Sequence, residues 1–370
     1  MRILSRYVLR EFLVPVAYCL VAFTALHLIF ELFGEFDKII SAKPPAGILL
    51  RYIGGYLAKD MQWLITPALL LGGLYSMWQL ARHGEITAMR ANGIGFVSIT
   101  APILCAACVF SVLTWLCGEF YAPKAIKDAD AIKESGFRKA TARVLADFHF
   151  NNVVDRRDWQ AASFDTARNT LRNVKISWTD DDGYIFRTLS ADRAVWNGDS
   201  WWFLGANATD FIHQPGASSL VASRRTERSF LVMPELKETP RDFEIEYVMQ
   251  GNNPSAESLS SGDIRRYLAL RPNLAGSDRR AWIYEMFNRH ATPLACIFIT
   301  LFAIPAGLAT GRQSVFAGVV TAILLFIGYY ALSLVCGVMA KNGSLPVWFG
   351  IFAPNAAIFC AGLWIFRKQR

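Results

Sequence analysis

The chain alternates long uncharged stretches with a single polar block. Six stretches lack Asp, Glu, Lys and Arg, and each reaches the ~20 residues that an α-helix needs to cross a hydrocarbon core roughly 30 Å thick. In chain order they are Phe12–Phe30, Met61–Ala81, Asn92–Gly118, Ala291–Gly311, Gln313–Ala340 and Asn342–Phe366. The segment Glu119–His290, between the third and the fourth, has the charge density of a soluble protein. The pattern predicts six transmembrane helices with a soluble domain inserted between the third and the fourth.

Hydrophobic periodicity divides the chain further. The inserted segment contains short alternating runs that are typical of β-strands, and helical patterns flank these runs on both sides. We therefore predict an α-helical polytopic membrane protein with an inserted all-β, jelly-roll-like domain. The predicted division is transmembrane helices 1 to 3 over residues 1–122, a helical linker over 123–142, the β domain over 143–250, linker helices over 251–290, and transmembrane helices 4 to 6 over 291–370.

Turn signals delimit the strands of the inserted domain. Asn197-Gly198 lies between Ala194–Trp196 and Trp201–Phe203, and Asn-Gly offers two positions that tolerate positive φ, as in a tight hairpin. Asp180–Gly183 predicts a second turn. Several short strands at this spacing favour a sandwich or jelly-roll pair of sheets. The aromatic residues of the strands, Trp202 among them, either form the core or line a groove for an apolar ligand, and their alternation favours the core.

The excess of positive charge resides in the membrane portion. The inserted block carries 24 basic and 24 acidic residues, so the other segments carry 14 basic against 6 acidic, which accounts for the net charge of +8. A nucleic-acid-binding protein would carry the excess on its soluble domain, and we exclude that class. Basic residues concentrate in the segments on the side of the N-terminus, which predicts cytoplasmic termini and a non-cytosolic location for residues 119–290. All seven cysteines lie in the predicted spans, so the inserted domain has no disulfide.

The connection between the second and third spans is short and helix-forming. Within residues 82–93, Ile86 and Met89 share one helical face, Glu85 adds a charge, and Gly93 is a typical helix stop. One interpretation is a coupling helix that docks on a cytoplasmic motor through apolar side chains and a charged residue. The other is a simple interfacial helix, and the residues themselves favour neither interpretation.

The end of the first span has an unusual density of charge. Glu31, Glu35 and Asp37 precede Lys38 at the predicted boundary between membrane and water, where charge costs less than at the bilayer centre. Interfacial anchoring is the favoured explanation of these residues. Contact with a ligand is the alternative.

Five motifs occur in a recognisable order along the chain. They are Arg6-Tyr7-Val8 with Arg10-Glu11-Phe12, Gly84-Glu85-Ile86-Thr87-Ala88-Met89-Arg90-Ala91-Asn92-Gly93, Glu119-Phe120-Tyr121-Ala122-Pro123, Arg289-His290-Ala291-Thr292-Pro293-Leu294-Ala295, and Ile304-Pro305-Ala306-Gly307. With these motifs the sequence resembles, from its first residues to its last span, the LptF/LptG family, the paired permease subunits of the lipopolysaccharide-export ABC transporter. The second-to-third connection and the short C-terminal tail favour the LptG subunit.

The resemblance implies a subunit of the bacterial inner membrane. It would pair with a related permease, sit on a dimer of cytoplasmic ATPases, and pass lipopolysaccharide through its periplasmic domain to periplasmic bridge proteins. The residues implied to couple to the ATPase are Glu85, Ile86, Met89, Arg90 and Gly93. Basic lipid contacts are implied near the outer end of the first span, where this chain is mainly acidic. The candidate lipid contacts are Phe33, Lys38, Lys43 and, on a strand, Trp202.

Motifs for catalysis do not accompany these features. The sequence has no Gly-x-x-x-x-Gly-Lys-Ser/Thr loop, so we predict that ATP is hydrolysed by a separate partner and that the chain is not an enzyme. Gly307–Ser314 is only distantly similar to that loop, and we predict a turn there between the fourth and fifth spans. No metal or cofactor is predicted. A membrane-anchored periplasmic scaffold or sensor is the alternative function, which the short cytoplasmic segments disfavour.

Overall fold

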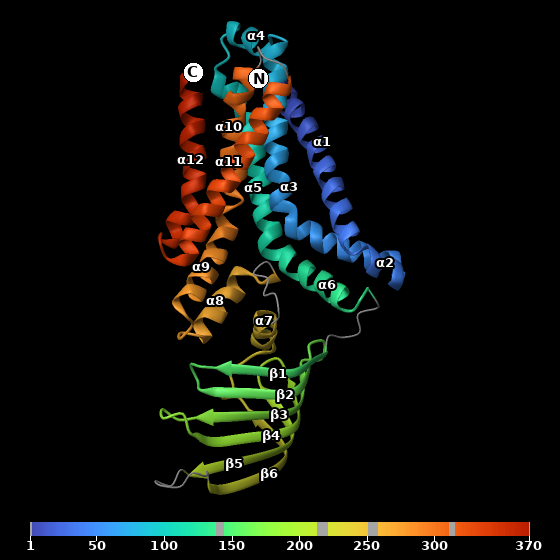
Figure 1. The fold of residues 1–370 in the computed structure, drawn as a ribbon, viewed down its shortest axis with the longest axis vertical. Coiled ribbons are helices and arrows are strands. Elements are labelled where there is room, and N and C mark those ends of the chain that lie inside the picture. Colours follow the sequence, from blue (N-terminus) through green and yellow to red (C-terminus); the bar gives the residue numbers. More distant parts are fainter. Residues whose placement is uncertain (1, 138–143, 213–220, 251–257, 311–314, 370) are drawn as a thin grey trace. The chain divides into compact units, whose positions relative to one another are not determined.

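A computed structural model describes residues 2–137, 144–212, 221–250, 258–310 and 315–369. The chain divides into two compact units: Met1–Arg138 with Gly276–Arg370, and Lys139–Ala275. The first unit, here the helical unit, contains only helices among its described residues, and the second, the β unit, contains a sheet and two helices. Because the helical unit comes from both ends of the sequence, the β unit is an insertion, as the sequence predicts (Figure 1).

Long apolar helices make up most of the helical unit. Five helices of the described residues are long and apolar enough to cross a membrane, and the bent pair α9 and α10 is a sixth candidate. The helices are α1 (Arg2–Gly34), α2 (Phe36–Ala42), α3 (Ala46–Arg82), α4 (Glu85–Ala91), α5 (Phe96–Leu116), the π-helix η1 (Cys117–Tyr121), α6 (Ala122–Glu134), α9 (Gly276–Ala291), α10 (Leu294–Thr310), α11 (Val315–Asn342) and α12 (Val347–Gln369). The predicted multi-pass membrane fold is confirmed, with five to six candidate spans.

The fourth predicted span, Ala291–Gly311, contains a sharp bend near its start. α9 ends at Ala291, α10 begins at Leu294, and the two helices differ in direction by 50°. Pro293 accounts for the break, because proline has no backbone N–H with which to continue the hydrogen-bond ladder of α9. The third span differs, since its helical backbone continues from α5 through η1 into α6.

Gly307 brings two helices of this unit close together. It lies within α10, so the predicted turn at Gly307–Ser314 is wrong in its first half, while residues 311–314 lie outside the described residues. A Cβ atom at Gly307 would come within 2.7 Å of the Leu74 carbonyl oxygen and 2.8 Å of Met77 Cβ, both on α3. Only glycine fits this contact. Because lipid tails are as apolar as leucine, close packing of this kind is what stabilises helix pairs in a membrane.

The β unit contains one six-stranded antiparallel sheet. Its strands pair in sequence order, and Figure 1 shows them stacked from β1 to β6. They are β1 (Val144–Asn152), β2 (Arg157–Asp165), β3 (Thr170–Thr179), β4 (Ile185–Trp196), β5 (Trp201–Ile212) and β6 (Val221–Met233). The predicted β insertion is confirmed. Its described strands form a meander within one sheet, however, whereas the sequence suggested a pair of sheets.

Both predicted turns join neighbouring strands. Asp180 donates its N–H to the Tyr184 carbonyl over 2.9 Å in the turn between β3 and β4. The hairpin between β4 and β5 is also confirmed, since Trp196 pairs with Trp201 across it. Its asparagine does not adopt positive φ; only Gly198 does, at +91°. Asn197 donates its N–H to the Ser200 carbonyl over 3.1 Å, so the turn is as tight as expected, while the expected two positive-φ positions are corrected to one.

A line of backbone irregularities, here called the crease, crosses the sheet. Along strands β1 to β5 every second side chain points into the core, and at this line the alternation shifts by one position. In β3, for example, Leu171 is buried before the line and Val174, three residues later, is buried after it. Asp147, Asn173 and Gly205, on alternate strands, have positive φ there. By the register of the flanking pairs, the crease runs through Asp147, Ala162, Asn173, Asp192, Gly205 and Ser229. Irregularities of this kind bend the strands that contain them.

The bent sheet encloses a residue of a helix. Phe243 of α7 (Pro240–Gln250) is fully buried, and its ring centroid lies 5.0 to 5.8 Å from the rings of Phe148, Phe150, Trp159, Phe164 and Trp201. Trp159 on β2 and Trp201 on β5 lie 5.6 Å apart, although three strand spacings in a flat sheet measure about 14 Å. The two layers expected of a sandwich are therefore two halves of the same strands, and the inward aromatic residues form a core.

Candidate functional sites

The connection between the second and third spans folds into the short helix α4. Gly84 precedes the helix with φ +71°, and Gly93 follows it with φ +78°, a conformation that glycine adopts without steric cost. Ile94 donates its N–H to the Met89 carbonyl over 3.1 Å, which closes the helix as glycine-terminated helices commonly close. In Figure 1, α4 lies at the end of the helical unit that also carries the N- and C-terminal residues.

Ile86 and Met89 point into the protein. They are only 6% and 8% exposed and belong to the same buried cluster as Val8, Leu80 and Ile99. They anchor α4 to the helical unit, and little of their surface remains exposed. Periodicity identified the apolar face but could not show what covers it. The exposed face of α4, here the docking face, consists of Thr87, Ala88, Arg90 and Ala91.

Polar contacts tie this region to α1. The Tyr7 hydroxyl donates a hydrogen bond to Glu85 over 3.0 Å, and the Gln79 side-chain amide lies 3.4 Å from the Glu11 carboxylate. Glu85, expected to contact an ATPase, therefore has a partner within its own chain. The Tyr7 contact thus attaches α4 to α1, and the buried face of α4 attaches it to the helical core.

The acidic residues at the C-terminal end of the first span form a second candidate site, here called the charged seam. Glu35 is 9% exposed and forms ion pairs with Lys133 of α6 at 2.6 Å and with Lys38 of α2 at 2.8 Å. Glu31 accepts a hydrogen bond from the Tyr52 hydroxyl of α3 at 2.6 Å. The carboxylates thus hold α1 and α2 against α3 and α6, which supports interfacial anchoring.

The surroundings of the charged seam fix its protonation. Burial raises the pKa of Glu35, but the hydrogen bonds from Lys133 and Lys38 outweigh burial and lower that pKa below its ordinary value. Burial, together with the hydrogen bond to Glu31, raises the pKa of Tyr52. Glu35 is therefore charged and Tyr52 neutral near pH 7, and Lys133, 98 positions away from Glu35 in sequence, neutralises the carboxylate.

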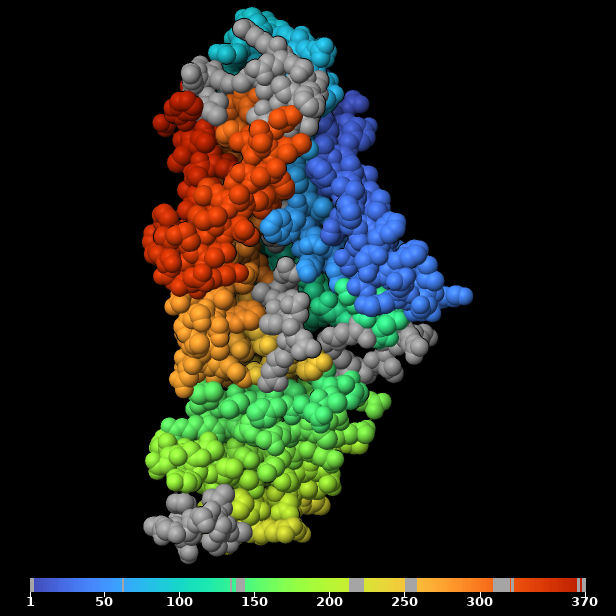
Figure 2. All heavy atoms as spheres, viewed as in Figure 1, coloured from blue at the N-terminus to red at the C-terminus, as the bar shows by residue number. Residues whose placement is uncertain are grey.

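Three proposed lipid contacts belong to this region, and one of them, Lys38, is part of the charged seam. Phe33 is 71% exposed, and its ring stacks on Phe36 at 6.0 Å. Lys38 is bound to Glu35, although its side chain remains 58% exposed. Lys43 is exposed and caps α2 in the left-handed conformation. In Figure 2 this end of α1 and α2, in blue, projects from one side of the helical unit.

Trp202 lies in the β unit on the outer face of the sheet. Its side chain is 37% exposed and packs edge-to-face on Phe230 with ring centroids 5.5 Å apart, while its neighbour Trp201 is fully buried. The single-residue alternation between the two tryptophans follows the pleat of β5. Trp202 is therefore a surface residue of the β unit, whereas the other proposed contacts belong to the helical unit.

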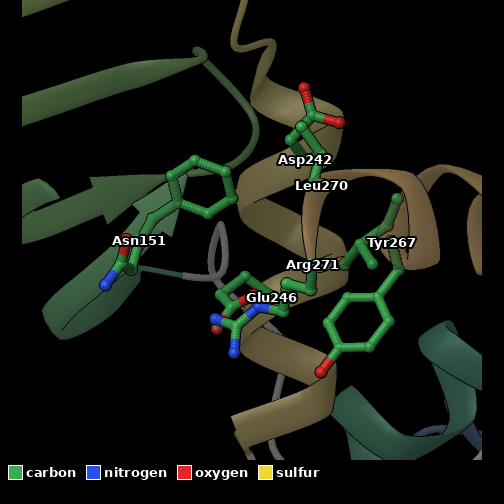
Figure 3. Close-up of a pocket in the computed structure, with 8 residues that line it drawn as sticks. Asn151, Asp242, Glu246, Tyr267, Leu270 and Arg271 are labelled. Atoms are coloured by element: carbon green, nitrogen blue, oxygen red, sulfur yellow. Dashed lines mark hydrogen bonds and ion pairs between the residues drawn. The ribbon is translucent and has the colours of Figure 1, made fainter. Parts of the chain in front are cut away.

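An ionic network between α7 and α8 (Ser261–Leu270) has no counterpart in the sequence analysis. Asp242 pairs with Arg266 and Glu246 with Arg271, while Arg241 pairs with Asp263 at 2.6 Å. Figure 3 shows the shallow hollow beside these helices, where Asp242, Glu246 and Arg271 lie in the wall. These charges satisfy one another across the helix pair, so the network holds α8 on α7. Because the partners are far apart in the chain, their pairing leaves no local sequence signal.

The arrangement defines a class of protein. Long apolar helices, a short helix between the second and third of the predicted spans, and an inserted β unit describe a multi-pass membrane protein with a β domain between its spans. The chain belongs to the family described as Lipopolysaccharide export system permease LptF/LptG, which matches residues 6–368. The family comprises both subunits, so the match assigns the chain to neither one in particular. No curated protein sequence matches the chain.

Proposed function

We propose that the chain is one permease subunit of an ABC transporter that extracts lipopolysaccharide from the inner membrane and passes it toward a periplasmic bridge. Its family, its multi-pass fold and its inserted β unit support this function. The proposed assembly contains a paralogous permease and a dimer of cytoplasmic ATPases. Both termini and α4 would face the cytosol, and residues 119–290 the periplasm, in agreement with the distribution of basic residues.

The composition and exposure of the docking face of α4 are the main structural support for this proposal. Thr87, Ala88 and Ala91 are small and exposed, and Arg90 adds a positive charge. A flat surface of small side chains allows a partner to approach the helix backbone closely. Ile86 and Met89, on the opposite side of α4 from the docking face, are buried in the helical unit. A partner that moves α4 would therefore also move the helices packed against it.

The lipid enters, in this proposal, along α1. This helix exposes several large apolar side chains toward its outer end, among them Val21 at 68%, Phe30 at 69% and Phe33 at 71%. The charged seam fixes the end of the helix, and Lys38 and Lys43 are the cations available for lipid phosphates. Glu35 competes for Lys38, so we expect this subunit to bind phosphate less strongly than a subunit that lacks the carboxylate.

A single substitution on the docking face tests the proposed association. Ala88→Arg places a long charged side chain at its centre, while Ala46→Arg makes the same change at an exposed position at the opposite end of α3. We expect Ala88→Arg to lower co-purification of the ATPase about tenfold or more, the effect of losing some 1.4 kcal/mol of binding. Ala46→Arg should have no effect. Equal recovery of the ATPase with both variants would contradict docking through α4.

A further inference from the structure

The outer face of the sheet changes character at the crease. On one side of the crease the outward positions form polar rows across all six strands. One such row consists of His149, Gln160, Lys175, Ser190, Asn207 and Glu227. A sheet that is packed on one face and solvated on the other shows this pattern.

On the other side of the crease, β5 and β6 expose apolar side chains. Trp202 pairs with Val232 and Leu204 with Phe230, and their exposed fractions are 37%, 39%, 40% and 47% in that order. These four residues are here called the outer apolar patch. Single exposed apolar side chains are ordinary on a protein surface, whereas a contiguous group marks an interaction site. The polar rows of the same face show that the fold itself does not require apolar residues there.

Two arginines border the outer apolar patch. Arg193 on β4 lies between Leu204 on β5 and Arg172 on β3, directly opposite each of them, and both arginines are exposed. Like charges in a direct cross-strand pair destabilise a sheet. Within the part of the chain that the structure describes, neither guanidinium has an ion-pair partner. An external anion would remove the repulsion between them.

We propose that this face binds the surface of an anionic lipid bilayer. Tryptophan and phenylalanine partition to the boundary between headgroups and acyl chains, and guanidinium groups bind phosphate oxygens in pairs. The outer apolar patch lies on the face of the bent sheet opposite its core, and its four side chains are 37% to 47% exposed, so it fits an extended surface better than an enclosed small molecule. Cations beside shallowly inserted aromatic side chains are the combination that attracts a protein to anionic lipids.

Because the β unit is covalently linked to membrane-spanning helices, even a weak affinity of its outer apolar patch for lipid would be sufficient for contact with the bilayer. The same polypeptide contains helices that are long and apolar enough to span a membrane, so the effective concentration of bilayer around the β unit is high without any further affinity. The β unit would therefore rest on the membrane by this face for part of the time.

Photo-crosslinking in a defined bilayer tests the proposal. A photo-reactive amino acid replaces either Phe230 or, as the control, Gln160, which faces outward beyond the crease. Each full-length protein is placed in nanodiscs of phosphatidylcholine with or without phosphatidylglycerol. We expect lipid adducts at position 230, more with phosphatidylglycerol than without, and few at position 160. Equal adduct yields at the two positions, or crosslinks from position 230 to a second copy of the chain, would overturn the proposal.

The arginine pair provides a second test. With both Arg172→Gln and Arg193→Gln, contact at position 230 should fall about 30-fold in discs with phosphatidylglycerol, the effect expected for two charges near an anionic surface. It should not change in phosphatidylcholine alone. The double variant should unfold in urea at the same concentration as the unchanged protein or a higher one, because the repulsion is gone. Unchanged contact in both kinds of disc would refute the assigned role of the arginines.

Discussion

Replacing Phe243 with alanine tests whether the inside of the creased sheet is a core or a groove. Phe243 is fully buried, and five aromatic rings from the strands surround it at centroid distances of 5.0 to 5.8 Å. If the enclosed space is a core, Phe243→Ala leaves a cavity that the surrounding rings cannot fill. If it is a groove that α7 merely occupies, the sheet should tolerate the change.

The expected loss of stability follows from the burial of the ring. Phenylalanine-to-alanine changes in protein cores cost about 3 to 5 kcal/mol, which includes the lost transfer free energy and the cavity. Aromatic contacts of this geometry favour the upper part of that range. With a urea m-value of about 2 kcal/mol/M for a unit of this size, the unfolding midpoint should fall by about 2 M.

Tryptophan fluorescence during urea unfolding of the full-length protein in nanodiscs measures this shift, because Trp159 and Trp201 contact Phe243 directly. The matched control is Phe230→Ala, since Phe230 is 47% exposed on the outer face and surface substitutions usually change stability by about 0.5 kcal/mol or less. A midpoint for Phe243→Ala within about 0.5 M (roughly 1 kcal/mol) of that control would refute the description of the enclosed space as a core.

Two further predictions concern the helical unit. Because the folded-state pKa of Glu35 lies below its ordinary value, the carboxylate stabilises the fold above pH ~4.3 and loses this contribution as the pH falls through the lowered pKa. The difference in melting temperature between the unchanged protein and Glu35→Gln should therefore be present at pH 7 and disappear below about pH 4. A difference that grows on acidification would contradict the charged seam. Gly307→Leu should prevent α10 from packing on α3 and lower the yield of folded protein, measured by size-exclusion chromatography. The control Gly328→Leu should not lower this yield, because a Cβ atom at Gly328 would meet no other atom within 4 Å. Similar yields from the two variants would show that the close approach of α10 and α3 is dispensable.

The sequence predicted those features that local patterns determine. The five to six candidate spans, the helix at Glu85–Ala91 and the turns at Asp180 and Gly198 lie where uncharged length, glycine and turn residues predict them. Each depends on residues that are neighbours in the chain. The structure confirms an inserted β domain for the same reason, since alternation along single strands is a local property.

Features that depend on distant contacts were not predictable in this way. The spacing of Ile86 and Met89 predicts that they share an apolar face of α4. The residues that cover this face come from other helices of the helical unit. Glu35 has its principal partner, Lys133, in a helix far along the chain. The crease shifts the alternation of buried residues by one position in strands β1 to β5, and such a shift resembles a strand end, so the sequence favours short strands in a pair of sheets.

ATP-driven transfer of lipopolysaccharide tests the central proposal most directly. Proteoliposomes that contain the chain, its paralogous permease and the ATPase dimer are loaded with lipopolysaccharide, and its transfer to a periplasmic acceptor protein is followed with and without ATP. The account predicts transfer that requires both ATP and this chain and that is lost with Ala88→Arg. Transfer of equal rate when the chain is omitted, or ATP hydrolysis by the purified chain alone, would contradict it.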